Sequence, residues 1–154
     1  MEQIKIRLAR SKDKNQLLDN FKHYNVNEII KNRVDCYTSH NFTVIAKIGD
    51  ELVGILQWYV KEDPKAGVVE FEEVYVSENH RGKGIASSLM GFAIRSVKEY
   101  FKKHNLKLRK IFLFVSKNNK PARALYEKYG FNYITGIGPL FYDDEEEVFY
   151  VLDF

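Results

Sequence analysis

Residues 74–86, VYVSENHRGKGIA, decide the fold of this chain. An apolar run ends at Val76, a polar turn with two glycines follows, and an apolar helical repeat begins at Ile85. Backbone N–H groups in such a turn, together with the positive end of the helix dipole, form an anion site. Glycines let the backbone come close to a bulky pyrophosphate. The stretch therefore predicts a phosphate-binding loop between a strand and a helix.

Two common classes of phosphate-binding protein do not fit this loop. P-loop NTPases carry Gly-x-x-x-x-Gly-Lys-Ser/Thr, whereas Gly84 is followed here by Ile85. Dinucleotide-binding folds carry Gly-x-Gly-x-x-Gly after the first strand of a βαβ unit. Here Ser87 stands at the third glycine, and the strands before the loop are expected to form a hairpin.

Apolar periodicity predicts the elements on both sides of the loop. Strands are expected at residues 4–8, 42–48, 52–60, 68–76, 111–115, 131–135 and 148–152. Helices are expected after a cap at Ser11 or Asp13, at 27–36, at 85–104, and from Pro121 to a C-cap at Gly130. The order β-α-α-β-β-β-α-β-α-β-β predicts a mixed sheet with helices packed on it, in the α/β or α+β class.

Length and composition favour one cytoplasmic domain. A chain of 154 residues fits a single domain, 1–154. Its one cysteine, Cys36, excludes an internal disulfide and a multi-cysteine metal site. No apolar run approaches the roughly 20 residues that a membrane helix needs, and we expect no signal peptide. The histidines lack metal-ligand spacing, so no metal site is expected.

Charge is distributed unevenly along the chain. The net charge of +3 is too small to indicate nucleic-acid binding. Acidic residues fill 143–147, and such a run is either a solvated turn or a negative entrance that steers a cationic ligand.

The loop and a later segment resemble one known family. Residues 81–86, RGKGIA, match Arg/Gln-x-x-Gly-x-Gly/Ala, the acetyl-CoA pyrophosphate motif of the GNAT superfamily. Residues 119–131, NKPARALYEKYGF, resemble the family's Asn…Ala-x-x-Leu-Tyr-Glu-Lys-x-Gly-Phe segment. The resemblance implies a GNAT-like fold of about seven mostly antiparallel strands and about four helices. It also implies an acyltransferase, an acetyl-CoA-dependent N-acetyltransferase of class EC 2.3.1.-.

The resemblance assigns cofactor-binding residues to this sequence. Backbone groups of the strand before the loop would pair with pantetheine, and the loop would hold the pyrophosphate, with Arg81 and Lys83 adding charge or remaining solvated. Asn119 would hydrogen-bond the CoA arm, or it would serve as a helix N-cap. The full set is Val74, Tyr75, Val76, Arg81, Gly82, Lys83, Gly84, Ile85, Ala86, Ser87 and Asn119.

The same resemblance implies two catalytic residues. Tyr126 aligns with the tyrosine that protonates the departing CoA thiolate. Some members carry a glutamate base on the strand after the long helix, but Phe114 stands there in this sequence. Others carry it on the pantetheine strand, so Glu72 is the expected base. Glu70 and Glu73 remain candidates, and a regular strand would place Glu70 and Glu72 on one face with Val74.

The acceptor is an amine that the sequence does not name. The expected reaction is direct attack by a primary amine in a ternary complex. A small cationic amine, a polyamine, or a protein or peptide amine would fit, and Asp35 and Tyr37 are candidate entrance residues. A catalytically silent CoA-binding regulatory module remains an alternative, and a basic nucleic-acid-binding domain ranks last. We expect no membrane partner, and a homodimer is common in such folds.

Overall fold

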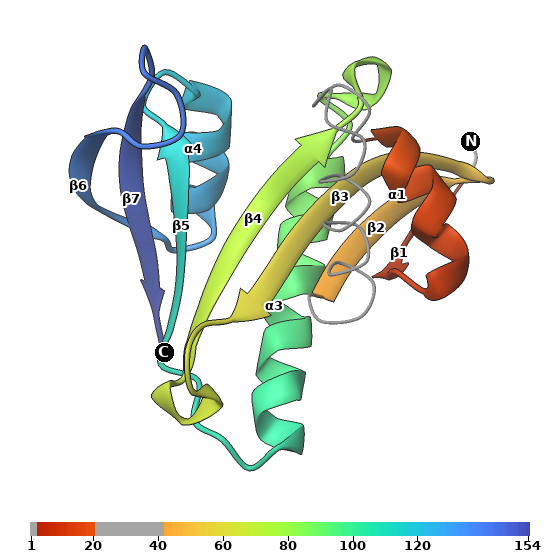
Figure 1. The fold of residues 1–154 in the computed structure, drawn as a ribbon. Helices are drawn as coiled ribbons and strands as arrows, with labels where there is room; N and C mark the ends of the chain where they lie inside the picture. The colour runs from red at the N-terminus through yellow and green to blue at the C-terminus, as the bar shows by residue number, and fades with distance from the viewer. Residues whose placement is uncertain (1–2, 21–41) are drawn as a thin grey trace. The chain divides into compact units, whose positions relative to one another are not determined.

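The computed structural model describes residues 3–20 and 42–154, and their strands form a seven-stranded mixed sheet (Figure 1). The order across the sheet is β1-β2-β3-β4-β5-β7-β6. The strands are β1 Ile4–Leu8, β2 Phe42–Ile48, β3 Glu51–Val60, β4 Val68–Val76, β5 Lys110–Ser116, β6 Asn132–Pro139 and β7 Glu146–Asp153. β4 pairs with β5 in parallel, whereas β1–β2, β2–β3, β5–β7 and β6–β7 pair antiparallel. The predicted mixed, mostly antiparallel sheet is confirmed.

Three α-helices lie in the described part of the chain. They are α1 Lys14–Asn20, which follows a 3₁₀ turn at Ser11–Asp13, α3 Ile85–Lys103 and α4 Lys120–Lys128. The sequence predicted about four, and the remaining one, at 27–36, lies outside the described residues. Cys36, Asp35 and Tyr37 lie outside them as well.

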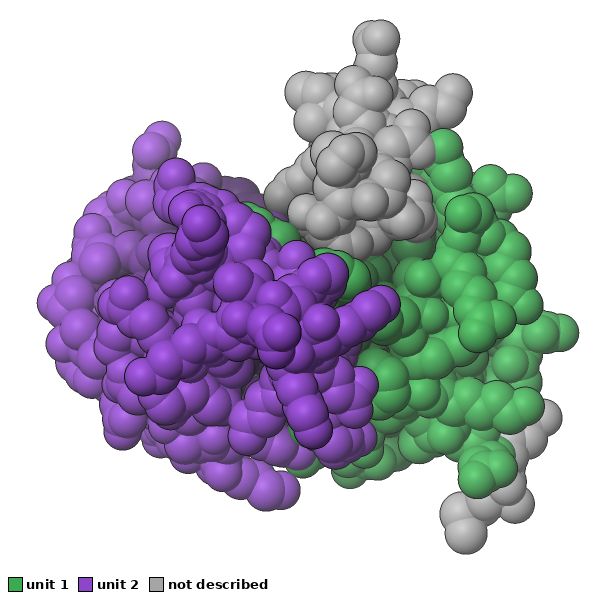
Figure 2. All heavy atoms as spheres, turned by 90° about the horizontal axis from the view of Figure 1, so that it is seen from below, with its two compact units in different colours: residues 1–59, 73–93 green, residues 60–72, 94–154 purple. Residues whose placement is uncertain are grey.

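The contacts within the chain define two compact units (Figure 2). Unit 1 comprises residues 1–59 and 73–93, and unit 2 comprises residues 60–72 and 94–154. Both β4 and α3 begin in one unit and end in the other. The expectation of one N-acetyltransferase domain over 1–154 stays a prediction.

One cluster of the unit 1 core lies between α1 and the strands β2 and β3. Leu17 of α1 packs with Ile45 and Ile55, and all three side chains are fully buried. Tyr75 at the end of β4 packs against the same cluster. The apolar spacing of α1 therefore turns one face of this short helix onto the sheet.

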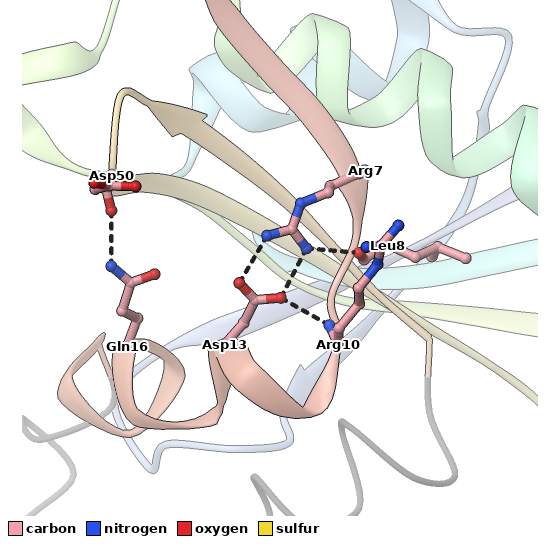
Figure 3. Close-up of polar contacts among 6 residues, drawn as sticks. All are labelled: Arg7, Leu8, Arg10, Asp13, Gln16 and Asp50. Atoms are coloured by element: carbon pink, nitrogen blue, oxygen red, sulfur yellow. Dashed lines mark hydrogen bonds and ion pairs between the residues drawn. The ribbon is translucent and has the colours of Figure 1, made fainter.

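An ion pair fixes the start of α1 (Figure 3). Arg7 of β1 donates two hydrogen bonds to Asp13, of 2.7 and 2.8 Å. Asp13 is buried and also accepts the backbone N–H of Arg10 at 2.8 Å. The sequence predicted a cap at Ser11 or Asp13. Arg10 is the N-cap of the 3₁₀ turn before α1, and Asp13 takes part in the capping because its side chain accepts the Arg10 N–H, whereas Ser11 lies inside the turn.

Unit 2 contains the three strands β5, β7 and β6 with α4 against them (Figure 1). Pro121 lies in the first turn of α4, as predicted, and Gly130 follows the helix with a left-handed φ of 87°. The predicted ends of the last two strands were wrong. Pairing of Pro139 with Glu146 extends both strands beyond the apolar residues that signalled them.

Candidate active site

The loop before α3 has the backbone conformation of an anion site. Gly82 and Gly84 have φ of 74° and 76°, values that only glycine adopts freely. A Cβ built at either glycine meets no atom within 4 Å. Among the described residues, no hydrogen bond uses the N–H groups of residues 82–86. These open N–H groups at a helix N-terminus fit a pyrophosphate.

Side chains of the loop bind back onto its own carbonyls. Arg81 Nε donates to the carbonyl of Val76 at 3.2 Å, and Lys83 Nζ donates to the carbonyl of Asn79 at 3.0 Å. Ser77 Oγ and His80 Nδ1 lie 2.9 Å apart. These contacts brace the loop in its open shape. The sequence assigned no role to His80, and only the Ser-x-x-His spacing could have suggested one.

The strand β4 departs from the regular alternation that the sequence predicted. Glu73 has a left-handed φ of 48°, which breaks the alternation of side chains after Glu72. The prediction that Val74 shares a face with Glu70 and Glu72 was therefore wrong. Within unit 2 the parallel pairing with β5 ends at Glu70 and Phe112. The use of Val74, Tyr75 and Val76 by pantetheine stays a prediction.

The three candidate bases on β4 have different surroundings. Glu70 is buried and pairs with Lys61 Nζ at 3.0 Å, as expected of a structural carboxylate. Glu72 is half-buried, in the extended part of the strand. Glu73 is half-buried at the irregular position. Glu72 remains the predicted base.

Helix α4 of unit 2 begins at Asn119 and buries Tyr126. Asn119 Oδ1 accepts the N–H of Ala122 at 3.2 Å, so Asn119 is the N-cap of α4, which was one of its two predicted roles. Its contact with the CoA arm stays a prediction. Tyr126 is 5% exposed and packs against the rings of Phe131 and Tyr150. Burial raises the pKa of Tyr126, so its hydroxyl stays protonated at neutral pH. A protonated phenol is the state that a general acid requires.

A hydrogen-bond relay between α4 and β7 was not foreseen from the sequence. Tyr150 Oη donates to Glu127 Oε1 at 2.7 Å, and Arg123 Nε donates to Tyr150 Oη at 3.1 Å. Burial is the main reason that the pKa of Tyr150 is raised. Arg123 and Glu127 lie on either side of Tyr126 along α4, so the relay fixes the face that this helix turns to β7.

The acidic run does not behave as one surface feature. Glu146 pairs with Lys117 Nζ at 2.5 Å. Glu147 is a buried residue of β7, and burial followed by the charge of Glu145 raises its pKa. The sequence predicts one shared role for these acids, because an acidic run gives no signal of where a strand begins.

Two further kinds of site were sought in the described part of the chain. No three His, Cys, Asp or Glu side chains there lie together in a way that could hold a metal ion. No helix there is long and apolar enough to cross a membrane.

Comparison with known proteins identifies the family. A model of the acetyltransferase (GNAT) family matches residues 9–131, more than half of the chain. The chain belongs to the GNAT acetyltransferase family. The motif-based expectation is thus confirmed.

Solved structures of this family share the fold. An acetyltransferase of the GNAT family from Streptococcus pneumoniae has a TM-score of 0.79 at 17% identity, covering 99% of this chain and 100% of that one. The protein yncA from Salmonella typhimurium, solved with its cofactor acetyl-CoA, has a TM-score of 0.79 at 17% identity, covering 97% and 93%. At these identities the likeness concerns the fold of this GNAT chain.

Curated relatives match over part of their length. The spermine/spermidine N(1)-acetyltransferase of Bacillus subtilis is 28% identical over 86 residues, covering 56% of this chain and 53% of the relative. The mycothiol acetyltransferase of Corynebacterium efficiens is 36% identical over 86 residues, covering 54% and 25%. The match thus spans about half of the first relative and a quarter of the second.

Proposed function

We propose that this GNAT chain is an acetyl-CoA-dependent N-acetyltransferase that acetylates a primary amine by direct attack in a ternary complex. The observation that carries the proposal is the loop at residues 81–87. Its two left-handed glycines have open space at Cβ, and its N–H groups at residues 82–86 have no partner among the described residues. Membership of the family adds the chemical class.

The residues proposed to hold acetyl-CoA lie on three elements. The N–H groups of residues 82–87 would bind the pyrophosphate, with Arg81 and Lys83 adding positive charge. Backbone groups of residues 74–76 would pair with pantetheine, and the amide of Asn119 would donate to the CoA arm. Bound there, acetyl-CoA supplies a thioester carbonyl that an amine can attack.

Two side chains of this chain are proposed to move protons. Tyr126 donates its phenolic proton to the departing thiolate, and burial keeps that proton in place before the reaction. Glu72 accepts a proton from the attacking amine, directly or through a water. The mechanism uses no metal ion, because both proton transfers are assigned to side chains.

The proposed acceptor is a cationic amine, either a small amine or polyamine or the amine of a peptide. The name of the Bacillus subtilis relative and the acids near the start of β7 support this class. The cytoplasm is the proposed compartment, because one cysteine cannot form an internal disulfide. A homodimer is compatible with the proposal, which involves neither nucleic acid nor a membrane.

An assay of CoA thiol release with a panel of amines tests the proposal. We expect release that depends on both acetyl-CoA and an amine, with one N-acetylated product per thiol. Acetyl-CoA binding without release for any amine would favour the silent regulatory module instead. Isothermal titration with duplex DNA in place of acetyl-CoA tests the nucleic-acid alternative, for which we expect no binding.

A further inference from the structure

Glu147 is a largely buried residue whose carboxylate has no partner among the described residues. It is 4% exposed, but its carboxylate oxygens are not fully enclosed, because the fully enclosed side-chain atoms without a partner belong to Gln57 and Trp58. Lys117, the residue after β5, pairs with Glu146 instead. Burying a carboxylate alone is costly, and that cost is recovered when a cation binds beside it.

The strand register places Glu147 beside aromatic rings. Phe149 is two residues along β7 and therefore lies on the same face as Glu147. Phe149 pairs with Phe114 of β5, and their ring centroids lie 5.2 Å apart. The ring centroids of Phe141 and Phe114 lie 6.3 Å apart, and the Phe141 side chain is 61% exposed. A carboxylate and a group of phenylalanine rings thus share one face of unit 2.

The positions opposite Glu147 on both neighbouring strands have small residues. Glu147 pairs with Ser116 of β5 and with Gly138 of β6. A Cβ built at Gly138 meets no atom within 4 Å. Neither neighbouring strand therefore places a large side chain opposite the carboxylate.

We propose that Glu147 and the rings of Phe114, Phe141 and Phe149 bind the non-reacting ammonium group of a diamine or polyamine acceptor. An aromatic face attracts an alkylammonium ion through its π electrons, and the rings also pack on the alkyl chain. An inorganic cation would gain less from the rings, and an anionic acceptor would be repelled by Glu147.

The chemistry indicates which nitrogen this site holds. A nearby carboxylate stabilises the protonated form of an amine, and a protonated amine cannot attack a thioester. The nitrogen held by Glu147 is therefore not the one that becomes acetylated. This inference rests on the proposed function, since it names the acceptor class of the same enzyme.

The test compares two acceptors in the variant Glu147→Gln. Spermidine carries additional ammonium groups, whereas butylamine has a single nitrogen. We expect the KM for spermidine to rise about 10- to 100-fold, as for loss of a charge-assisted hydrogen bond. The kcat for spermidine and the KM for butylamine should stay at the wild-type values.

Asp144→Asn is the matched control, since it removes the same charge from an exposed residue of the same run. Its effect on the spermidine KM should be less than about twofold at physiological salt, because exposed charges are screened. Equal effects in both variants would overturn the proposal. So would a Glu147→Gln variant that loses kcat at unchanged KM, because Glu147 would then act on the reacting nitrogen.

Direct binding separates failure of this site from failure of the proposed function. Spermidine is titrated calorimetrically into the protein saturated with desulfo-CoA, a form that cannot react. Binding that Glu147→Gln weakens at least about tenfold supports the site even if no thiol is released. If the wild-type protein does not bind spermidine, the proposed ammonium site is contradicted. Phe149→Leu keeps the carboxylate, and we expect it to weaken binding by a few-fold through loss of the ring.

Discussion

At the scale of single residues, Tyr126 is the side chain whose surroundings suit its proposed role most closely. Replacing it by phenylalanine removes one hydroxyl and keeps the ring between Phe131 and Tyr150. We expect Tyr126→Phe to lower kcat by roughly 10- to 10,000-fold, because the thiolate would depart unprotonated. Acetyl-CoA affinity, measured by titration, should not change. Wild-type turnover in this variant would assign the acid to another group.

Asp13 gives a prediction about stability rather than catalysis. Its hydrogen bonds with Arg7 lower the pKa of Asp13 from 3.8 to about 2 in the folded protein. A lowered folded-state pKa stabilises the fold above the unfolded-state value, and this contribution is lost as the pH falls towards 2. This contribution to the free energy of unfolding is about 2 kcal/mol at neutral pH.

Denaturant unfolding at several pH values measures this contribution. The free energy of unfolding of Asp13→Asn should be lower than that of the wild type at pH 7, and the two should converge between pH 4 and pH 2. A difference that persists unchanged at pH 2 would show that Asp13 acts through shape rather than charge.

At the scale of elements, α4 is held to β7 by the Arg123–Tyr150–Glu127 relay. Tyr150→Phe removes both hydrogen bonds and keeps the ring packed against Tyr126. We expect a loss of about 1 kcal/mol in the free energy of unfolding. We also expect a smaller loss of kcat than in Tyr126→Phe, because α4 is less firmly oriented while the acid remains.

Tyr133→Phe is the control for this relay. Tyr133 packs edge-on against Tyr150, but its side chain is half exposed. The free energy of unfolding and the kcat of Tyr133→Phe should match the wild-type values. In the double variant Tyr126→Phe/Tyr150→Phe, kcat should equal that of Tyr126→Phe alone, since the relay acts through Tyr126. Additive losses would show that Tyr150 affects turnover by another route.

At the scale of the whole molecule, the features predicted from sequence are those with local signals. The strand, glycine turn and helix at residues 74–86, the Pro121 helix and the β2–β3 hairpin each depend on neighbouring residues, and each is found where it was predicted. The family could be recognised for the same reason.

Features set by distant residues were not predictable. Tyr150 meets α4 only because β7 pairs beside β5, and nothing near Tyr150 in the sequence signals this. The sequence around Glu147 is typical of an acidic turn, yet its pairing with Ser116 places Glu147 in a strand. The left-handed backbone at Glu73 was also missed, because the surrounding residues have the pattern of a regular strand.

The affinity of acetyl-CoA for two glycine variants tests the central claim most directly. Gly84 in unit 1 and Gly138 in unit 2 have φ of 76° and 72°, and both have open space at Cβ. Valine at either position therefore imposes a similar backbone strain. Titration calorimetry should show a Kd at least about tenfold higher for Gly84→Val and unchanged for Gly138→Val, both folded by circular dichroism. An unchanged Kd in folded Gly84→Val would contradict the assignment of this loop as the acetyl-CoA site.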